Sequence, residues 1–170
     1  HMLKAVVFDM FETLVSLYNV GHYSGRKIMK DMQLSEVQFR PSWNASERDR
    51  TCGKATFEAV IEEIMKANGC YSKELYDNIV YRRKSALRKA FGNPHPEIIP
   101  MLKALRENEI KIGLITNCYF EERDAMKENE IFDLFDVTCL SCEEGIAKPD
   151  KEIFYLCLER LGLKSEECLY

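Results

Sequence analysis

A chain of 170 residues, of which 46% are apolar, is long enough to bury a hydrophobic core, so we expect one globular unit. Its 24 Lys and Arg residues against 28 Asp and Glu residues give a net charge of −4, which argues against a nucleic-acid-binding protein. No apolar run approaches the roughly 20 residues that span a bilayer, and no signal-peptide pattern is visible. We therefore expect a cytoplasmic protein with neither a membrane nor a nucleic acid as its partner.

The first predicted strand lies within residues 3–15, LKAVVFDMFETLV. An apolar run over residues 5–8 ends on Asp9, and a turn then leads to Thr13. Such a run is typical of a strand that is covered on both faces, and the carboxyl ends of parallel strands are where open sheets bind ligands. Asp9 is therefore a candidate for chemistry, although it could also serve only as a cap for the turn.

Residues 16–92 have a mostly helical pattern. Apolar positions recur at helical spacing in residues 23–32, and further helices are predicted after Thr56 and Ser72. Residues 44–54 are polar and predict a turn. We interpret the whole segment as a helical cap domain inserted after the first strand, because a simple crossover between adjacent parallel strands needs far fewer residues.

The last of these predicted helices carries a basic run. Its members are Arg82, Arg83, Lys84, Arg88 and Lys89. They are either a face that attracts anions to a site or a solvated helix surface near the negative end of the helix dipole.

From residue 93 onward, predicted strands and helices alternate. This alternation indicates parallel pairing and right-handed crossovers, so we predict an α/β fold with a three-layer, Rossmann-like core made of residues 3–15 and 93–170. The predicted elements are a helix begun by Pro96, a strand at 110–116, a helix near 121–129, a strand at 136–140, a helix at 149–161 and a strand that starts at Cys168.

Seven cysteines are scattered through these elements. Their number is odd and the chain is too long to need disulfide staples, so we expect reduced thiols. Cys139 and Cys142 have CxxC spacing at the end of a predicted strand. With no second pair and no histidine nearby in the sequence, we interpret this spacing as structural rather than as a zinc or redox site.

Three polar positions follow predicted strands in a fixed order, namely Asp9, Thr116 and the Lys148 that precedes Pro149. This order resembles the first three motifs of the haloacid dehalogenase-like (HAD) hydrolase superfamily of the helical-cap type. The resemblance covers residues 3–15 and 96–170. It implies an enzyme that acts on a small anionic substrate through a covalent aspartyl intermediate.

The resemblance also implies a role for each motif residue. Asp9 would be the nucleophile, and Lys148 would supply the positive charge that holds it and offsets charge on the transferring group. Thr116 would bind that group through its hydroxyl, and Asn117 through its backbone N–H. A Mg²⁺ cofactor would take Asp9 and the backbone carbonyl of Phe11 as ligands.

Phe11 departs from the pattern of the family's phosphatases, which carry an acid/base Asp at this position. The next position, normally Gly, is Glu12, a carboxylate that could substitute only from a different direction. The form Asp-x-aromatic-x-Thr-Leu resembles the 2-haloacid dehalogenases, which need no metal and use an arginine of the cap. Spacing alone does not choose among Arg40, Arg48 and Arg50. Both phosphatase-like and dehalogenase-like chemistry stay open.

The acidic pair that forms the family's fourth motif is absent before Tyr170. We therefore expect a C-terminally truncated core that binds Mg²⁺ weakly or not at all. The strand that starts at Cys168 would leave an exposed sheet edge, through which the chain could self-associate. The alternative function is a catalytically impaired or non-enzymatic binding domain with the HAD fold.

Overall fold

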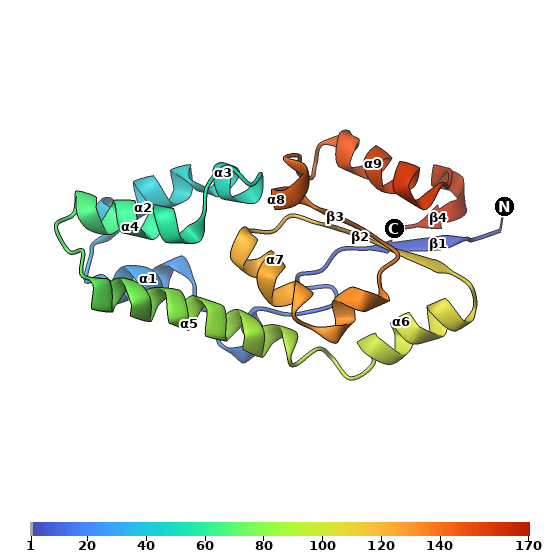
Figure 1. Ribbon diagram of the computed structural model, residues 1–170, viewed down its shortest axis with the longest axis horizontal. Helices are drawn as coiled ribbons and strands as arrows, with labels where there is room; N and C mark the ends of the chain where they lie inside the picture. Colours follow the sequence, from blue (N-terminus) through green and yellow to red (C-terminus); the bar gives the residue numbers. More distant parts are fainter. Residues whose placement is uncertain (1) are drawn as a thin grey trace.

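The computed structural model describes residues 2–170, in which the central sheet has four parallel strands (Figure 1). The spatial order is β3-β2-β1-β4, so the long segment between β1 and β2 connects neighbouring strands. Their bounds are β1 (Ala5–Phe8), β2 (Lys111–Thr116), β3 (Val137–Leu140) and β4 (Cys168–Leu169). The predicted parallel α/β sheet is confirmed, including the pairing of Cys168 beside Ala5.

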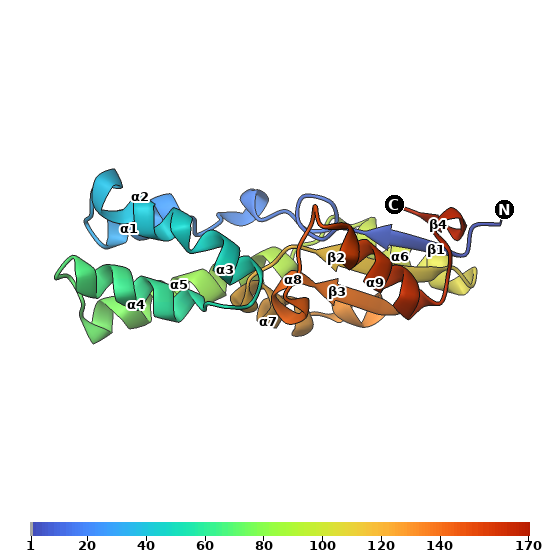
Figure 2. The ribbon, with the colours of Figure 1, turned by 90° about the horizontal axis from the view of Figure 1, so that it is seen from above.

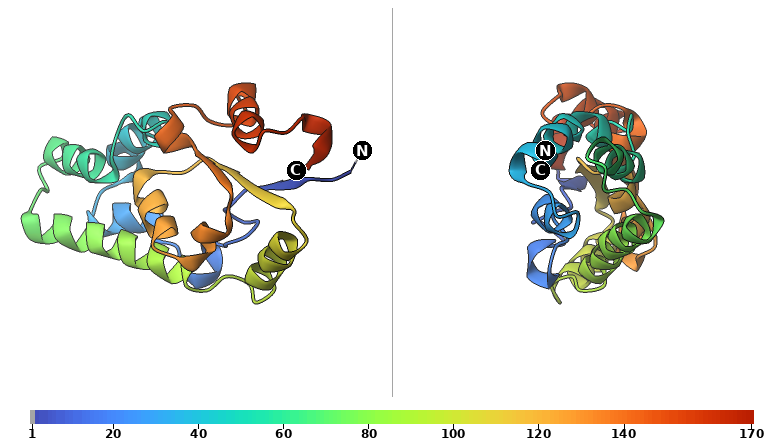
Figure 3. Two further views of the ribbon diagram at one scale, coloured as in Figure 1. Left: turned by 45° about the vertical axis from the view of Figure 1, so that its right-hand side comes forward. Right: turned by 90° about the vertical axis from the view of Figure 1, so that its left-hand side faces the viewer.

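Helices cover both faces of the sheet, as the alternation of side chains along β2 shows. Ile112 and Leu114 are buried in the cluster that includes residues of α6 (Ile98–Glu107) and α7 (Phe120–Lys127). Ile115 belongs to the opposite cluster, with residues of α9 (Lys151–Leu161). Figure 3 shows α6 and α9 on opposite sides of the strands. The predicted three-layer core is thus confirmed.

Helices α1 to α5 gather at the end of the molecule away from β4 (Figures 1 and 2). They bury a core of their own, built around Phe39, Phe57, Ile61 and Ile79. α5 continues to the sheet, where its Leu87 and Phe91 join the main core. We call helices α1 to α5 the helical segment; that it is a separate cap domain stays a prediction. Their bounds are α1 (Gly25–Asp31), α2 (Glu36–Ala45), α3 (Glu47–Thr51), α4 (Phe57–Ala67) and α5 (Lys73–Phe91).

Side-chain caps begin several of these helices where the sequence predicted. Thr56 accepts a hydrogen bond from the Ala59 N–H at the start of α4, and Ser72 accepts one from the Leu75 N–H at the start of α5. The turn predicted over residues 44–54 is wrong, because α2 runs to Ala45 and α3 occupies Glu47–Thr51. This stretch is polar because it lies on the surface; only Arg50 within α3 is buried.

Short elements complete the chain between the main helices and strands. They are η1 (Tyr18–Val20), η2 (Glu130–Leu134), α8 (Ser141–Glu144) and η3 (Ser165–Glu167). None of the helices within residues 2–170 is both long enough and apolar enough to span a bilayer.

Candidate active site

Asp9 and Lys148 form an ion pair at the carboxyl end of the sheet. Asp9 directly follows β1, and its Oδ2 lies 2.8 Å from Lys148 Nζ. The Met10 N–H donates to Asp9 Oδ1 at 2.8 Å, which fixes the orientation of the carboxylate. The Asp9 side chain is 45% exposed and that of Lys148 25% exposed, so both remain open to a ligand. The structure therefore brings together the two residues predicted to be catalytic.

Asn117 holds the main chain of Lys148 with its side chain. Its Nδ2 donates to the Lys148 carbonyl at 3.0 Å, and its Oδ1 accepts from the Lys148 N–H at 2.9 Å. This paired contact fixes the loop from which Lys148 reaches Asp9. Thr116, the last residue of β2, is buried, and its hydroxyl donates to the Asn117 carbonyl at 3.3 Å.

The turn after Asp9 offers no acid/base group to this pair. The Phe11 ring packs edge-on against Phe91, with ring centroids 5.9 Å apart. Glu12 has a left-handed backbone with φ of 60°, a conformation that suits glycine better than glutamate. Its carboxylate accepts hydrogen bonds from the Leu17 N–H and the Ser16 hydroxyl, both at 2.8 Å. Glu12 thus serves the turn that follows it.

A pocket of about 310 Å³ opens beside Lys148, between the helical segment and the sheet. Arg48 of α3 lines this pocket and forms no ion pair with any residue of the described part of the chain. Arg40 instead pairs with Glu36 at 2.9 Å, and Arg50 is buried. Of the three arginines considered from the sequence, only Arg48 is available to a ligand here. The lining residues are Asn44, Ala45, Glu47, Arg48, Thr51, Cys52, Asn117, Ala147 and Lys148.

Arg50 joins the helical segment to the loop that follows Asn117. Its guanidinium carbon lies 4.1 Å from the ring centroid of Trp43 and 4.3 Å from that of Tyr119. Arg50 Nε donates to Ser46 Oγ at 3.0 Å, whereas its buried Nη1 has no partner within residues 2–170. Cation–π contacts of this kind are strongest when desolvated, as Arg50 is.

A buried ion pair makes a second connection between the helical segment and the core. Arg83 of α5 donates to Glu121 of α7 at 3.1 Å and to the Tyr23 carbonyl at 2.9 Å. Arg83 therefore fits neither interpretation of the basic run, because it is 3% exposed and attracts no ligand. Three other members of the run have carboxylate partners, in the pairs Arg82–Asp31, Lys84–Glu58 and Arg88–Glu128.

Glu122 stands beside this pair and is also buried. Burial raises the pKa of Glu122 from 4.5 to about 7; the charge of Arg83 opposes this effect, and that of Glu121 adds to it. Its Oε1 accepts the Tyr119 N–H at 2.9 Å at the start of α7. A carboxyl group with such a pKa changes charge near neutral pH.

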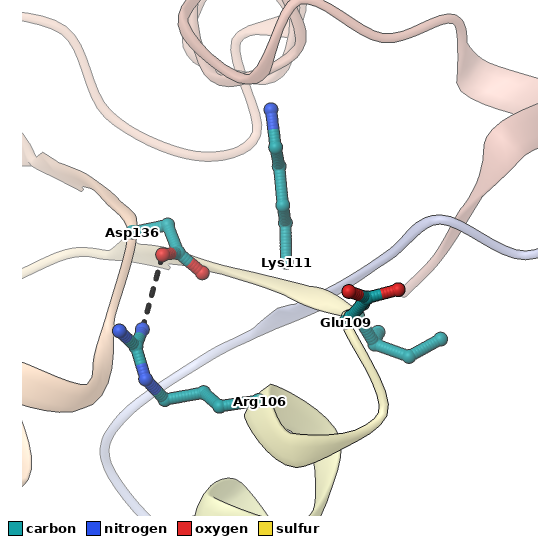
Figure 4. A pocket seen from close by; sticks show the side chains of 5 residues that line it. Arg106, Glu109, Lys111 and Asp136 are labelled. Atoms are coloured by element: carbon teal, nitrogen blue, oxygen red, sulfur yellow. Dashed lines mark hydrogen bonds and ion pairs between the residues drawn. The ribbon is translucent and has the colours of Figure 1, made fainter.

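A second, smaller pocket of about 150 Å³ lies at the opposite end of β2 (Figure 4). Three of its charged side chains, those of Arg106, Lys111 and Asp136, already have partners within the protein. Arg106 donates to Asp136 at 3.0 Å, and Lys111 donates to the Leu161 carbonyl at 3.2 Å. Since it lies far from Asp9, we do not include it in the candidate site.

The donor set for a metal is small. Within residues 2–170, no three His, Cys, Asp or Glu side chains are grouped closely enough to hold a metal ion. Asp9 is the carboxylate that meets Lys148, and each of its oxygens already takes one hydrogen bond or ion pair. Its remaining lone pairs and the Phe11 carbonyl would supply only part of a Mg²⁺ shell, and water and substrate phosphate would have to supply the rest.

The sequence is similar to a family of hydrolases and to a phosphatase. The family model of haloacid dehalogenase-like hydrolases matches residues 3–170. The glyceraldehyde 3-phosphate phosphatase of Methanopyrus kandleri is 25% identical over 99% of this chain and 75% of its own length.

Solved structures share the fold. A HAD family enzyme from Bacteroides thetaiotaomicron, also crystallised with magnesium and inorganic phosphate, superimposes with a TM-score of 0.76 and 19% identity, over 99% of this chain and 83% of its own. The L-2-haloacid dehalogenase of Xanthobacter autotrophicus has a TM-score of 0.60 and 21% identity, over 98% of this chain and 68% of its own.

Proposed function

Because the chain belongs to the haloacid dehalogenase-like hydrolase family, we propose that it hydrolyses a small phosphate ester through a covalent intermediate on Asp9. The contact of 2.8 Å between Asp9 Oδ2 and Lys148 Nζ carries this proposal. Transfer of an anionic group requires an anionic nucleophile beside a fixed positive charge, and the contact between the Asp9 carboxylate and the Lys148 ammonium supports these two roles. The phosphatase from Methanopyrus kandleri supports a phosphate ester as the substrate.

In the first step, an Asp9 oxygen attacks phosphorus and the ester oxygen leaves with the electron pair of the broken bond. In the second step, water attacks phosphorus, phosphate departs and the Asp9 carboxylate is restored. Lys148 offsets the charge on the transferring group, which also binds the Thr116 hydroxyl and the Asn117 backbone N–H. Asp9 and the Phe11 carbonyl would hold a Mg²⁺ ion weakly, and such an ion would supply further positive charge. Since Phe11 cannot protonate the leaving oxygen, substrates with acidic leaving groups are favoured.

Arg48 binds a second anionic or polar group of the same substrate. It lines the pocket that contains Lys148 and Asn117, and its guanidinium has no carboxylate partner in the described chain. A pocket of about 310 Å³ suits a small molecule. We expect Arg48→Ala to raise KM about tenfold for a phosphate ester with a second anionic group, with kcat little changed, and Arg48→Lys to recover part of the loss. An equal effect on a neutral aryl phosphate would contradict this role.

Displacement of halide from a 2-haloacid is the second candidate, and Phe11 is the observation that favours it. Because halide needs no proton in order to leave, the lack of an acid at position 11 does not slow this reaction. In that case Asp9 forms a carboxylic ester with the substrate, and Arg48 or Lys148 binds the substrate carboxylate.

Asp9→Asn tests both candidates. The wild type and the variant are assayed with an aryl phosphate, glyceraldehyde 3-phosphate and a chlorinated 2-alkanoic acid. We expect one class to be hydrolysed by the wild type, and the variant to fall to background because an amide is a poor nucleophile. An unchanged circular dichroism spectrum and melting temperature would show that the fold is intact. Activity near the wild-type level in the variant would remove Asp9 from the mechanism, and no activity in the wild type would favour the binding-domain alternative.

A further inference from the structure

Two cysteines meet beside the candidate site, although they are not the pair that the CxxC spacing suggested. Cys118 Sγ and Cys142 Sγ lie 3.8 Å apart, and both side chains are buried. Cys118 directly follows Asn117, the residue that holds the Lys148 main chain. Cys142 is the second residue of α8, which begins the loop leading to Lys148. Both thiols therefore belong to the two segments that build the site.

The Cys118–Cys142 contact lies where the helical segment touches the core. The Ser141 hydroxyl donates to the Thr51 carbonyl at 2.7 Å and accepts from the Cys118 N–H at 2.9 Å. Gly53 lies against the main chain of Cys142: a Cβ at Gly53 would lie 2.0 Å from the Cys142 carbonyl oxygen. Cys142 is 5% exposed, so we expect an oxidant to reach its sulfur when the turn at Gly53 moves away from α8.

We propose that Cys118 and Cys142 are a redox-active dithiol that a hydroperoxide converts into a disulfide, and that this disulfide distorts the site around Lys148. The Cys142 thiolate attacks a peroxide oxygen, the O–O bond breaks and a sulfenic acid forms as water or alcohol leaves. The Cys118 sulfur then attacks the Cys142 sulfur, and its proton leaves with the hydroxide as water. Two thiols are oxidised and one peroxide is reduced by two electrons.

The surroundings suit Cys142 as the attacking group. The hydrogen bond from Cys118 lowers the pKa of the Cys142 thiol, although burial opposes this, and the positive charge of Arg123 lowers it further. The same hydrogen bond and burial raise the pKa of the Cys118 thiol, with Glu122 adding to the effect. The proton therefore stays on Cys118 while Cys142 becomes the thiolate, which is the reactive form.

Closing the bond requires movement that reaches the site. A disulfide has an S–S distance of about 2.05 Å, so the two sulfurs must approach by nearly 2 Å. α8 has four residues, and the loop after it carries Lys148. Drawing α8 toward Cys118 therefore alters the contact between Asn117 and Lys148, and with it the position of Lys148 at Asp9. This effect on activity, unlike the bond itself, rests on the proposed function.

Cys139 and Cys157 provide an internal comparison. Both are fully buried between the sheet and α9, in the cluster on the far side from α6. They belong to the cluster around α9 and not to the segments that hold Asn117 and Lys148, so we expect them to stay reduced when Cys118 and Cys142 are oxidised.

The test is peptide mapping of the full chain after hydrogen peroxide treatment and thiol blocking. We expect an intact-mass loss of about 2 Da, a cross-linked peptide that joins Cys118 to Cys142, and reversal by a thiol reductant. Cys118→Ser and Cys142→Ser should lack the cross-link, and Cys157→Ser should keep it. The proposal would be overturned by a cross-link between Cys139 and Cys157 alone. It would also be overturned if peroxide oxidised all of the free thiols without forming a disulfide.

Hydrolase activity is measured on the same samples. We expect a loss of at least tenfold on oxidation, which the reductant reverses in the wild type and which does not occur in Cys142→Ser. A cross-link with unchanged activity would overturn the claimed distortion of Lys148. The mass readout does not depend on hydrolysis, so a failure of the proposed function leaves the disulfide itself tested.

Discussion

Phe11 decides which reactions the Asp9–Lys148 pair can perform. It stands two positions after Asp9, the proposed nucleophile, and its ring packs against Phe91 at the end of α5. The ring thus closes the core beneath the turn, where a carboxylic acid would otherwise protonate a leaving group. A side chain at position 11 can therefore either pack against Phe91 or act as an acid, but not both.

We expect Phe11→Asp to raise the rate with an aryl phosphate by about 10²–10⁴, the usual contribution of an acid/base group. Phe11→Asn is the matched control, because it has nearly the same shape as Asp but no titratable proton. Both variants lose the packing against Phe91, so their melting temperatures should fall together. Equal rates for the two variants would show that a missing acid is not what limits phosphate chemistry here.

Helices α5 and α7 are joined by charge as well as by apolar packing. Arg83 and Glu121 are both almost fully buried, and removing one partner of such a pair typically costs about 3–5 kcal/mol. The cost arises because the remaining charge has no water to solvate it. This ion pair therefore favours the arrangement in which the helical segment rests on the core.

Glu122 on α7 should make stability depend on pH. Its pKa is about 7 in the folded protein and 4.5 in the unfolded chain, so the folded state binds the proton more tightly. The resulting stabilisation is fully present below pH 4.5 and is lost as pH rises through 7. It amounts to about 3 kcal/mol over that window.

Denaturant unfolding at several pH values tests this expectation. Glu122→Gln keeps an oxygen that can accept the Tyr119 N–H, but it does not titrate, so its free energy of unfolding should decline less between pH 4.5 and 7. Glu159→Gln, an exposed position, is the control and should follow the wild type. Parallel curves for the wild type and Glu122→Gln would contradict the raised pKa.

Local sequence signals predicted much of the fold because their physical causes are local. Apolar runs marked β1 and β2, and Thr56 and Ser72 marked two helix starts. The contact of Asn117 with Lys148 left no such signal, since it joins two loops far apart in the chain. Arg83 was misread for the same reason: its partner Glu121 lies on another helix, and a basic run gives no sign of burial.

At the scale of the whole molecule, the candidate site lies between the sheet-based core and the helical segment. Asp9 and Asn117 follow strands of the sheet, Lys148 comes from the loop between α8 and α9, and Arg48 comes from the helical segment. Movement of the helical segment would therefore change access to Asp9 and to Cys142 together. Self-association through the edge at β4 stays a prediction.

The most direct test of the account is the mass of the peptide that contains Asp9 after turnover in ¹⁸O-labelled water and an acid quench. A phosphate ester should leave a gain of about 80 Da on Asp9 at early times, as expected for an acyl phosphate. A 2-haloacid should instead leave a gain of about 2 Da per labelled oxygen, because water then attacks the carboxyl carbon. Turnover with Asp9 unmodified under both conditions would contradict the covalent role of this residue.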